Sequence, residues 1–339
     1  MMDWNKGFSA RYYLGLVDSV TWLDGGTAQL TGGTITKNYT SDLVESATID
    51  LRERLTLGAE TWIRVWLDAR QNGDSAHVPV FTGLLSTPKR NLEGNVVSYS
   101  GECYSVLKPA ADVLLDRGWY AEKGRNGAEL VRELLSVGPA PVEIQNESPT
   151  LTEYIVAEDN ETNLSMAWKI LETIGWRLRI NGYGQIQILP TSTDISASFD
   201  YLSNDSLELN VTDTQDWFDC PNIFRAVIGN FTATVTDDDP DSILSTATRG
   251  REVWMQETNP SLGDGETIED YAKRRLIEEQ SPSRTLSYDR RFSPNVEIGD
   301  LIYLSYPGHG INGTFMVTNQ SIDLGYAAKT SEDVVIYEQ

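Results

Sequence analysis

Short segments with strand-like alternation, separated by turn signals, run through most of the sequence and constrain the fold more than any other feature. In residues 45–53 (ESATIDLRE), Ala47, Ile49 and Leu51 fall on one face of an extended chain and polar residues fall on the other. Similar segments fill residues 1–104, with few helical stretches between them. Short strands spaced in this way are typical of a small barrel or sandwich.

Turn residues predict how these strands connect. Residues 61–69 and 78–87 are rich in Val, Trp, Phe and Thr, and the Asn72-Gly73 step between them is a hairpin signal. Because paired glycines mark turns, we also expect Gly32-Gly33 to form a turn between two strands.

The segment 105–190 has a different, partly helical character. Residues 158–180 begin with an apolar stripe at helical spacing, for which Asn160 or Thr162 supplies the N-cap and Gly175 the end. A shorter helical face precedes this stripe, and a hairpin pattern follows it. The segment is therefore predicted to be a small α/β domain.

Strand patterns return after residue 190, with one predicted helix at residues 263–280 and a loop at residues 237–241 (DDDPD). The predicted fold class is mainly β with an α+β insert. The changes in pattern divide the chain into residues 1–104, 105–190 and 191–339.

The chain carries a strong excess of acidic residues, with 27 Lys and Arg against 50 Asp and Glu and a net charge of −23. The excess is greatest in residues 191–250, where eleven acids accompany two cations, Arg225 and Arg249. Binding to nucleic-acid phosphates or to an anionic membrane surface is driven by clusters of Lys and Arg, so the composition excludes both classes. A solvated acidic surface is the ordinary explanation, and a surface facing another polyanion or a cation site is the alternative.

No motif predicts catalysis or a cofactor. His77 and His309 are too isolated in the sequence to suggest a zinc site or a catalytic triad, and neither a G-x-S-x-G elbow nor a phosphate-binding glycine pattern is present. Asp237, Asp239 and Asp241 form a calcium candidate because Ca²⁺ prefers oxygen ligands. Their loop lacks EF-hand spacing, so a purely structural loop is the competing interpretation.

The compartment follows from simple features of the sequence. Cys103 and Cys220 are predicted to be buried thiols of a protein made in a reducing cytoplasm, with one disulfide between them as the alternative. We expect no signal peptide and no membrane segment, because the N-terminus lacks a basic stretch followed by an apolar run and no apolar run approaches roughly 20 residues.

Most tryptophans fall in strand or helix patterns, which favours a role in core or interface packing over a role in stacking on sugars.

Three stretches, in this order, resemble the phage tail hub family, which comprises the baseplate hubs of contractile tails and the distal-tail hubs of long flexible tails. They are residues 62–115, 124–190 and 267–323, which together cover just over half of the chain. In the last stretch the family typically shows a "vGD" segment followed by a "G.y.V" strand. The matching residues here are Pro294, Val296, Ile298, Gly299, Asp300, Gly313, Phe315 and Val317.

The resemblance implies a hub-type ring protomer with two tube-like β-barrel domains and small α/β domains. Residues 1–104 would hold the first barrel and residues 105–190 a peripheral α/β domain. Residues 191–339 would supply the second barrel and a small accessory domain, with strands exchanged between segments. Three protomers would form a ring that meets the hexameric tail tube on one side.

The partners implied by the resemblance are the protein itself as a homotrimer, the tail tube protein, distal tail or baseplate proteins, and a spike or tape-measure protein. The expected function is structural and non-enzymatic, at the tail tip of a virion made in the host cytoplasm, with no cofactor. A carbohydrate- or receptor-binding tail-tip β protein is the alternative function, and a glycosidase using two acids is the third.

The acidic excess then suggests a purpose. DNA would pass through the channel of the ring without specific binding, because acidic side chains repel its phosphates. The candidates for such lumen-facing acids are Asp213, Asp216, Asp219, Asp237 and Asp238.

Overall fold

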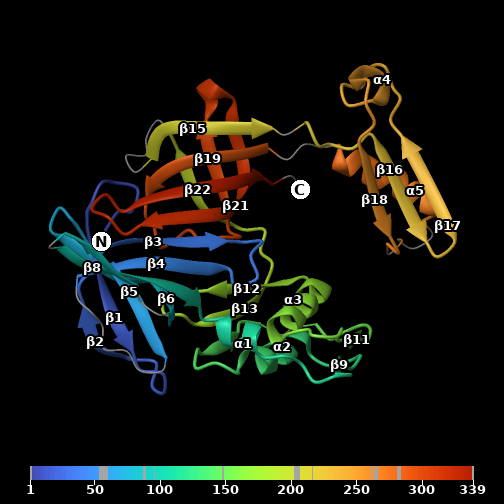
Figure 1. The fold of residues 1–339 in the computed structure, drawn as a ribbon. Coiled ribbons are helices and arrows are strands. Elements are labelled where there is room, and N and C mark those ends of the chain that lie inside the picture. Colours follow the sequence, from blue (N-terminus) through green and yellow to red (C-terminus); the bar gives the residue numbers. More distant parts are fainter. Residues whose placement is uncertain are drawn as a thin grey trace. The chain divides into compact units, whose positions relative to one another are not determined.

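In the computed structural model the chain forms two compact units (Figure 1). Unit 1 comprises Met1–Val211 and Ser287–Gln339, and unit 2 comprises Thr212–Leu286. The described residues are 2–52, 60–86, 89–94, 96–146, 149–201, 207–215, 217–260, 262, 266–280 and 284–337.

A fourteen-stranded sheet dominates the fold, in the order β15-β19-β22-β21-β3-β4-β8-β6-β5-β1-β2, with β14, β20 and β7 branching from this path. The unit boundary falls within β15 and β19. The strands are β1 (Ser9–Val17), β2 (Asp24–Ala28), β3 (Leu30–Asn38), β4 (Glu45–Leu51), β5 (Thr61–Gln71), β6 (Asp74–Leu85), β7 (Lys89–Glu93), β8 (Val96–Ser105), β14 (Ile195–Asp200), β15 (Leu207–Gln215), β19 (Arg284–Arg291), β20 (Leu301–Tyr306), β21 (Ile311–Asp323) and β22 (Lys329–Ile336). The short 3₁₀ helix η1 (Pro307–His309) joins β20 to β21.

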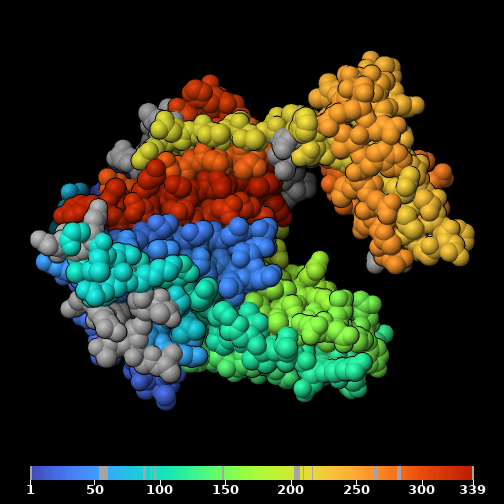
Figure 2. All heavy atoms as spheres, viewed as in Figure 1, coloured from blue at the N-terminus to red at the C-terminus, as the bar shows by residue number. Residues whose placement is uncertain are grey.

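The N-terminal and C-terminal parts of unit 1 meet within this sheet. Strand β3 pairs antiparallel with β21, from Asn38 opposite Asn319 to Thr34 opposite Asp323. Figure 2 shows the blue N-terminal and red C-terminal atoms in contact over unit 1. Sequence segments more than 280 residues apart therefore share one hydrogen-bonded layer.

The prediction of a mainly β fold with a helical insert is confirmed. Among the described strands, the sheet order ends at β2 and β15 without closing on itself. The finer prediction of two tube-like barrels stays a prediction.

The predicted hairpin at Asn72-Gly73 is confirmed. Strands β5 and β6 pair antiparallel up to Gln71 opposite Asp74. Asn72 and Gly73 take positive φ values of 47° and 94°, as a tight two-residue hairpin requires.

The predicted turn at Gly32-Gly33 is wrong, because β3 runs straight through both glycines. Gly33 has φ 139°, and a Cβ there would lie 2.2 Å from the Thr48 carbonyl oxygen of β4. The glycines therefore permit a close approach of two paired strands instead of reversing the chain.

The helical insert of unit 1 forms as its local sequence predicts. Thr162 caps α3 (Asn163–Ile174) by accepting a hydrogen bond from the Ser165 backbone, and Gly175 ends the helix with φ 67°. The other elements are α1 (Lys108–Asp112), α2 (Gly127–Leu135), the two-stranded sheet of β9 (Tyr120–Ala121) and β11 (Ile155–Val156), and the three-stranded sheet of β10 (Val142–Ile144), β13 (Ile186–Pro190) and β12 (Trp176–Ile180). A core cluster that includes Leu130, Val131, Ile170 and Ile188 holds them together.

Unit 2 is a small three-stranded sheet packed against one helix. Its sheet has the order β17 (Phe231–Thr236), β16 (Ile223–Ile228) and β18 (Trp254–Thr258), and α5 (Ile268–Glu279) contacts β16 and β17. Its core is centred on Phe224, Tyr271 and Leu276. The short α4 (Thr246–Arg249) lies in the long connection between β17 and β18.

Two further features bear on the sequence expectations. Cys103 and Cys220 are buried and form no disulfide, as predicted. In the part of the chain that the structure describes, no helix combines the length and apolar character needed to cross a membrane.

Candidate functional site

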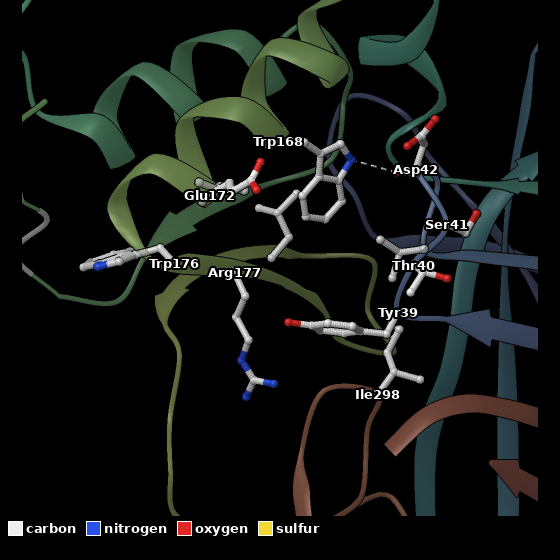
Figure 3. A pocket seen from close by; sticks show the side chains of 12 residues that line it. Tyr39, Thr40, Ser41, Asp42, Trp168, Glu172, Trp176, Arg177 and Ile298 are labelled. Atoms are coloured by element: carbon white, nitrogen blue, oxygen red, sulfur yellow. Dashed lines mark hydrogen bonds between the residues drawn. The ribbon is translucent and has the colours of Figure 1, made fainter. Parts of the chain in front are cut away.

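A cavity of about 550 Å³ opens in unit 1 between α3, β12 and the turn that follows β3 (Figure 3). Residues 39–44 form one wall, residues 168–178 form another, and Ile298 contributes from the C-terminal segment. The site therefore joins three parts of the chain that are far apart in sequence.

Hydrogen bonds fix the two walls against each other. The Asn38 side-chain oxygen accepts hydrogen bonds from the Thr40 backbone and hydroxyl at 2.8 Å each, which holds the turn after β3. From α3, the indole Nε1 of Trp168 donates to the Asp42 carbonyl at 3.1 Å. The aromatic wall is thus anchored to the turn that it faces.

Arg177 lies at the base of the cavity, with its side chain only 8% exposed. Its Nη1 donates to the Gly299 carbonyl, and its Nη2 donates to Asp300 Oδ1 at 3.2 Å. Its Nε has no hydrogen-bond partner among the described residues. Gly299 has φ 76°, and a Cβ there would lie 2.7 Å from both Arg177 Nη1 and Tyr39 Cε2, so the close packing requires glycine.

A buried ionic cluster also joins β3 and β4 to the C-terminal segment. Lys37 Nζ donates to Glu297 Oε2 at 2.6 Å and lies 3.8 Å from Glu45 Oε2. Glu45 Oε1 has no hydrogen-bond partner among the described residues. Burial raises the pKa of Glu45 to about 8, against the opposing effect of Lys37.

A second polar constellation lies on the sheet surface and includes His77, which is isolated from other candidate residues in the sequence but not in space. His77 on β6 pairs with Asp68 on β5, with 2.6 Å between His77 Nδ1 and Asp68 Oδ1. Tyr13 Oη lies 2.8 Å from His77 Nε2, and the His77 ring stacks on Trp66 at 4.2 Å. Burial and the charges of Asp68 and Asp24 raise the pKa of Tyr13.

The predicted lumen-facing acids do not share one environment. Asp213 on β15 is paired with Arg284 on β19 at 2.6 Å, and this hydrogen bond lowers the pKa of Asp213. Asp219 and Asp238 are exposed. Asp216 lies outside the described residues. Whether these acids face a channel stays a prediction.

The calcium candidates cap their own loop. Asp237 Oδ1 accepts the Asp239 backbone N–H at 3.1 Å, and Asp239 Oδ1 accepts that of Asp241 at 2.9 Å. Ser242 and Gln280 donate to the other Asp237 oxygen at 2.7 and 2.9 Å. No group of three or more His, Cys, Asp or Glu side chains that could hold a metal is found over the described ranges. The loop geometry agrees with the structural interpretation, and calcium binding stays untested.

Sequence reasoning missed the cavity altogether. Its only local signals were Trp168 on the helical stripe and the Gly299-Asp300 pair of the "vGD" segment. Neither signal indicates that β3, α3 and residues 298–300 meet in space.

No protein-family model matches the sequence, and no curated protein matches it. Several solved structures do match the fold of this chain. The 43 kDa tail protein of prophage MuSo2 from Shewanella oneidensis has a TM-score of 0.66 at 14% identity, covering 97% of this chain and 98% of that chain. The tail protein from Neisseria meningitidis MC58 has a TM-score of 0.64 at 14% identity, covering 96% of each chain.

A chain of the Francisella PdpA–VgrG complex has a TM-score of 0.60 at 6% identity, covering 97% of this chain and 58% of that chain. At such identities a likeness shows the fold. Over nearly its whole length, this chain has the fold of phage tail proteins, as its sequence resemblance predicted.

Proposed function

We propose that this protein is a structural component of a phage-type tail: a hub protomer that assembles as a homotrimeric ring and joins the tail tube to the tip apparatus. The observation that carries the proposal is the full-length fold match to a prophage tail protein, with 97% of this chain and 98% of that chain aligned. The match spans the whole chain and not one module of it, and the proposed role is an analogy drawn from that shared fold.

The architecture of unit 1 supports a structural, load-resisting role for the protein. Its large sheet draws strands from both ends of the chain, so opening it requires breaking contacts between distant segments. The two tube-like barrels and the division into residues 1–104, 105–190 and 191–339 belong to this proposal.

The partners follow from the same role. The tail tube protein would meet one face of the ring, and distal tail or baseplate proteins, a spike or the tape-measure protein would meet the other. The likeness to a chain of the PdpA–VgrG complex supports association with a further protein. DNA would pass through the ring unbound, repelled by acids such as those in residues 191–250.

Light scattering of the purified full-length protein, alone and mixed with its tail tube protein, tests the role directly. We expect a species of three times 37.8 kDa, alone or when the tube protein is present. Electron microscopy of the mixture should show rings capping tubes. A protein that stays monomeric and unattached beside assembled tubes would contradict the proposal, and a trimer with its acids on the outer rim would contradict the acidic channel alone.

A further inference from the structure

We propose that the cavity between α3, β12 and residues 39–44 binds a segment of a partner protein that presents one large apolar side chain flanked by basic residues. The choice of a protein as occupant rests on the proposed tail role. The character of the segment is inferred from the walls, the base and the rim of the cavity.

The walls accept an apolar group. Figure 3 shows the Trp168 indole and the Tyr39 ring on opposite sides of the opening, with Ile298 beside Tyr39. Trp168 and Ile298 are half-buried at the margin of the helical core, so each still exposes apolar surface. A volume of about 550 Å³ lies within the range of ligand pockets and accommodates one aromatic side chain with its adjoining backbone.

The base of the cavity carries no unbalanced charge. The Arg177 side chain lines the cavity and is more than nine-tenths buried. Its Nη1 and Nη2 donate to Gly299 and Asp300, and the Asp300 carboxylate balances its charge. The base therefore suits a neutral group.

The rim selects the charge of the occupant. Asp42 and Glu172 are exposed, and Figure 3 places their carboxylates at either end of Trp168. Arg177, the basic residue of the lining, is turned into the ion pair with Asp300. The rim is therefore negative, and Lys or Arg next to the apolar anchor would complement it.

The cavity is also held open before any partner arrives. The Trp168–Asp42 hydrogen bond fixes the indole, and the turn of residues 39–44 is held by Asn38. Preorganised walls lower the entropic cost of binding, which suits a small anchor.

Three capped tripeptides serve as probes in NMR titrations of the full-length protein: Lys-Trp-Lys, Glu-Trp-Glu and Lys-Ser-Lys. We expect saturable shifts at residues 39–44 and at Trp168 with Lys-Trp-Lys. Affinity should fall about tenfold for Glu-Trp-Glu, because two exposed charge pairs are lost and replaced by repulsion. Lys-Ser-Lys, which lacks the anchor, should give no saturable shift.

The double variant Asp42→Asn with Glu172→Gln changes only exposed carboxyl groups and should keep the fold. We expect it to bind Lys-Trp-Lys about fivefold more weakly and to lose the preference over Glu-Trp-Glu. The matched control is Asp116→Asn with Glu153→Gln, two exposed acids outside the cavity lining, which should leave both affinities unchanged.

Equal affinity for Lys-Trp-Lys and Glu-Trp-Glu, saturable binding of Lys-Ser-Lys at this site, or no saturable binding would overturn the proposal. So would displacement of the peptide by N-acetylglucosamine or maltose, which would assign the cavity to carbohydrate. If the protein binds the peptide but does not associate with tail tubes, the peptide-binding proposal stands and the proposed tail role is rejected. If the protein forms a trimer on tail tubes but does not bind the peptide, the tail role stands and the peptide-binding proposal is rejected.

Discussion

Units 1 and 2 differ in how much apolar burial and how much surface charge pairing contribute to their stability. Unit 1 holds two large apolar clusters and buries whole ion pairs beneath its sheets. Unit 2 has a small core around Phe224, and its helix α5 is bordered by arginine–glutamate pairs at the surface. Because surface pairs contribute little, unit 2 depends on a few apolar contacts, whereas unit 1 depends on burial spread over many.

Two of the buried networks of unit 1, around Glu332 and around Glu45, also differ from each other. Glu332 accepts hydrogen bonds from Tyr288, Arg290 and Gln320, so both of its oxygens are used. Glu45, in contrast, leaves one oxygen without a partner among the described residues. Burial therefore acts on Glu45 without full compensation by hydrogen bonds, which raises its pKa.

The largest effect is expected from Phe224→Ala in the core of unit 2. Loss of a fully buried phenylalanine costs about 4 kcal/mol, which is a large share of what a small core supplies. Hydrogen exchange should show the amides of β16 losing protection while those of β3 keep theirs. Phe81→Ala removes an equally buried ring from unit 1 and should leave β5 and β6 protected. If β16 keeps its protection in Phe224→Ala, unit 2 does not depend on a few apolar contacts more than unit 1 does.

Glu332→Ala should have the next largest effect, this time on unit 1. It leaves the buried Arg290 guanidinium without its carboxylate, at a cost of about 3 kcal/mol. Chemical denaturation monitored by tryptophan fluorescence measures the loss. Glu102→Ala, which removes an exposed partner of Lys89, should change the free energy of unfolding by less than about 0.5 kcal/mol.

Glu45 should make the stability of unit 1 depend on pH in the direction opposite to most carboxylates. Its pKa rises from 4.5 in the unfolded chain to about 8 in the folded one, so between these values the folded state binds the extra proton. Stability therefore falls as pH rises through this window, by up to about 1.4 kcal/mol per pH unit. In Glu45→Gln, denaturation at several pH values should show that the fall in unfolding free energy with rising pH is removed. An unchanged pH dependence would contradict the raised pKa of Glu45.

The smallest effect is expected from Arg275→Gln on α5. Arg275 pairs with Glu278 at 2.7 Å, with its side chain 26% exposed. We expect a loss below about 1 kcal/mol in unit 2 that disappears in high salt, because screening weakens partly exposed pairs. A loss of several kcal/mol at low salt that 1 M salt abolishes would show that surface charge, and not the Phe224 core, sustains this unit.

The sequence by itself determined the local elements. Alternation in residues 45–53 predicted β4, and Asn72-Gly73 predicted the β5–β6 hairpin. Gly175 predicted the end of α3, and of the two candidate N-caps, Asn160 and Thr162, the structure uses Thr162. These features depend on neighbours within a few residues, so a single sequence reveals them.

Only the tertiary structure decided which elements meet. Gly32-Gly33 has the local signature of a turn, but its place in β3 depends on Thr48 of the partner strand. The pairing of β3 with β21, and the cavity formed by residues 39–44, Trp168 and Ile298, join segments separated by more than a hundred residues. Local periodicity carries no record of such contacts, because they are selected by the packing of whole surfaces.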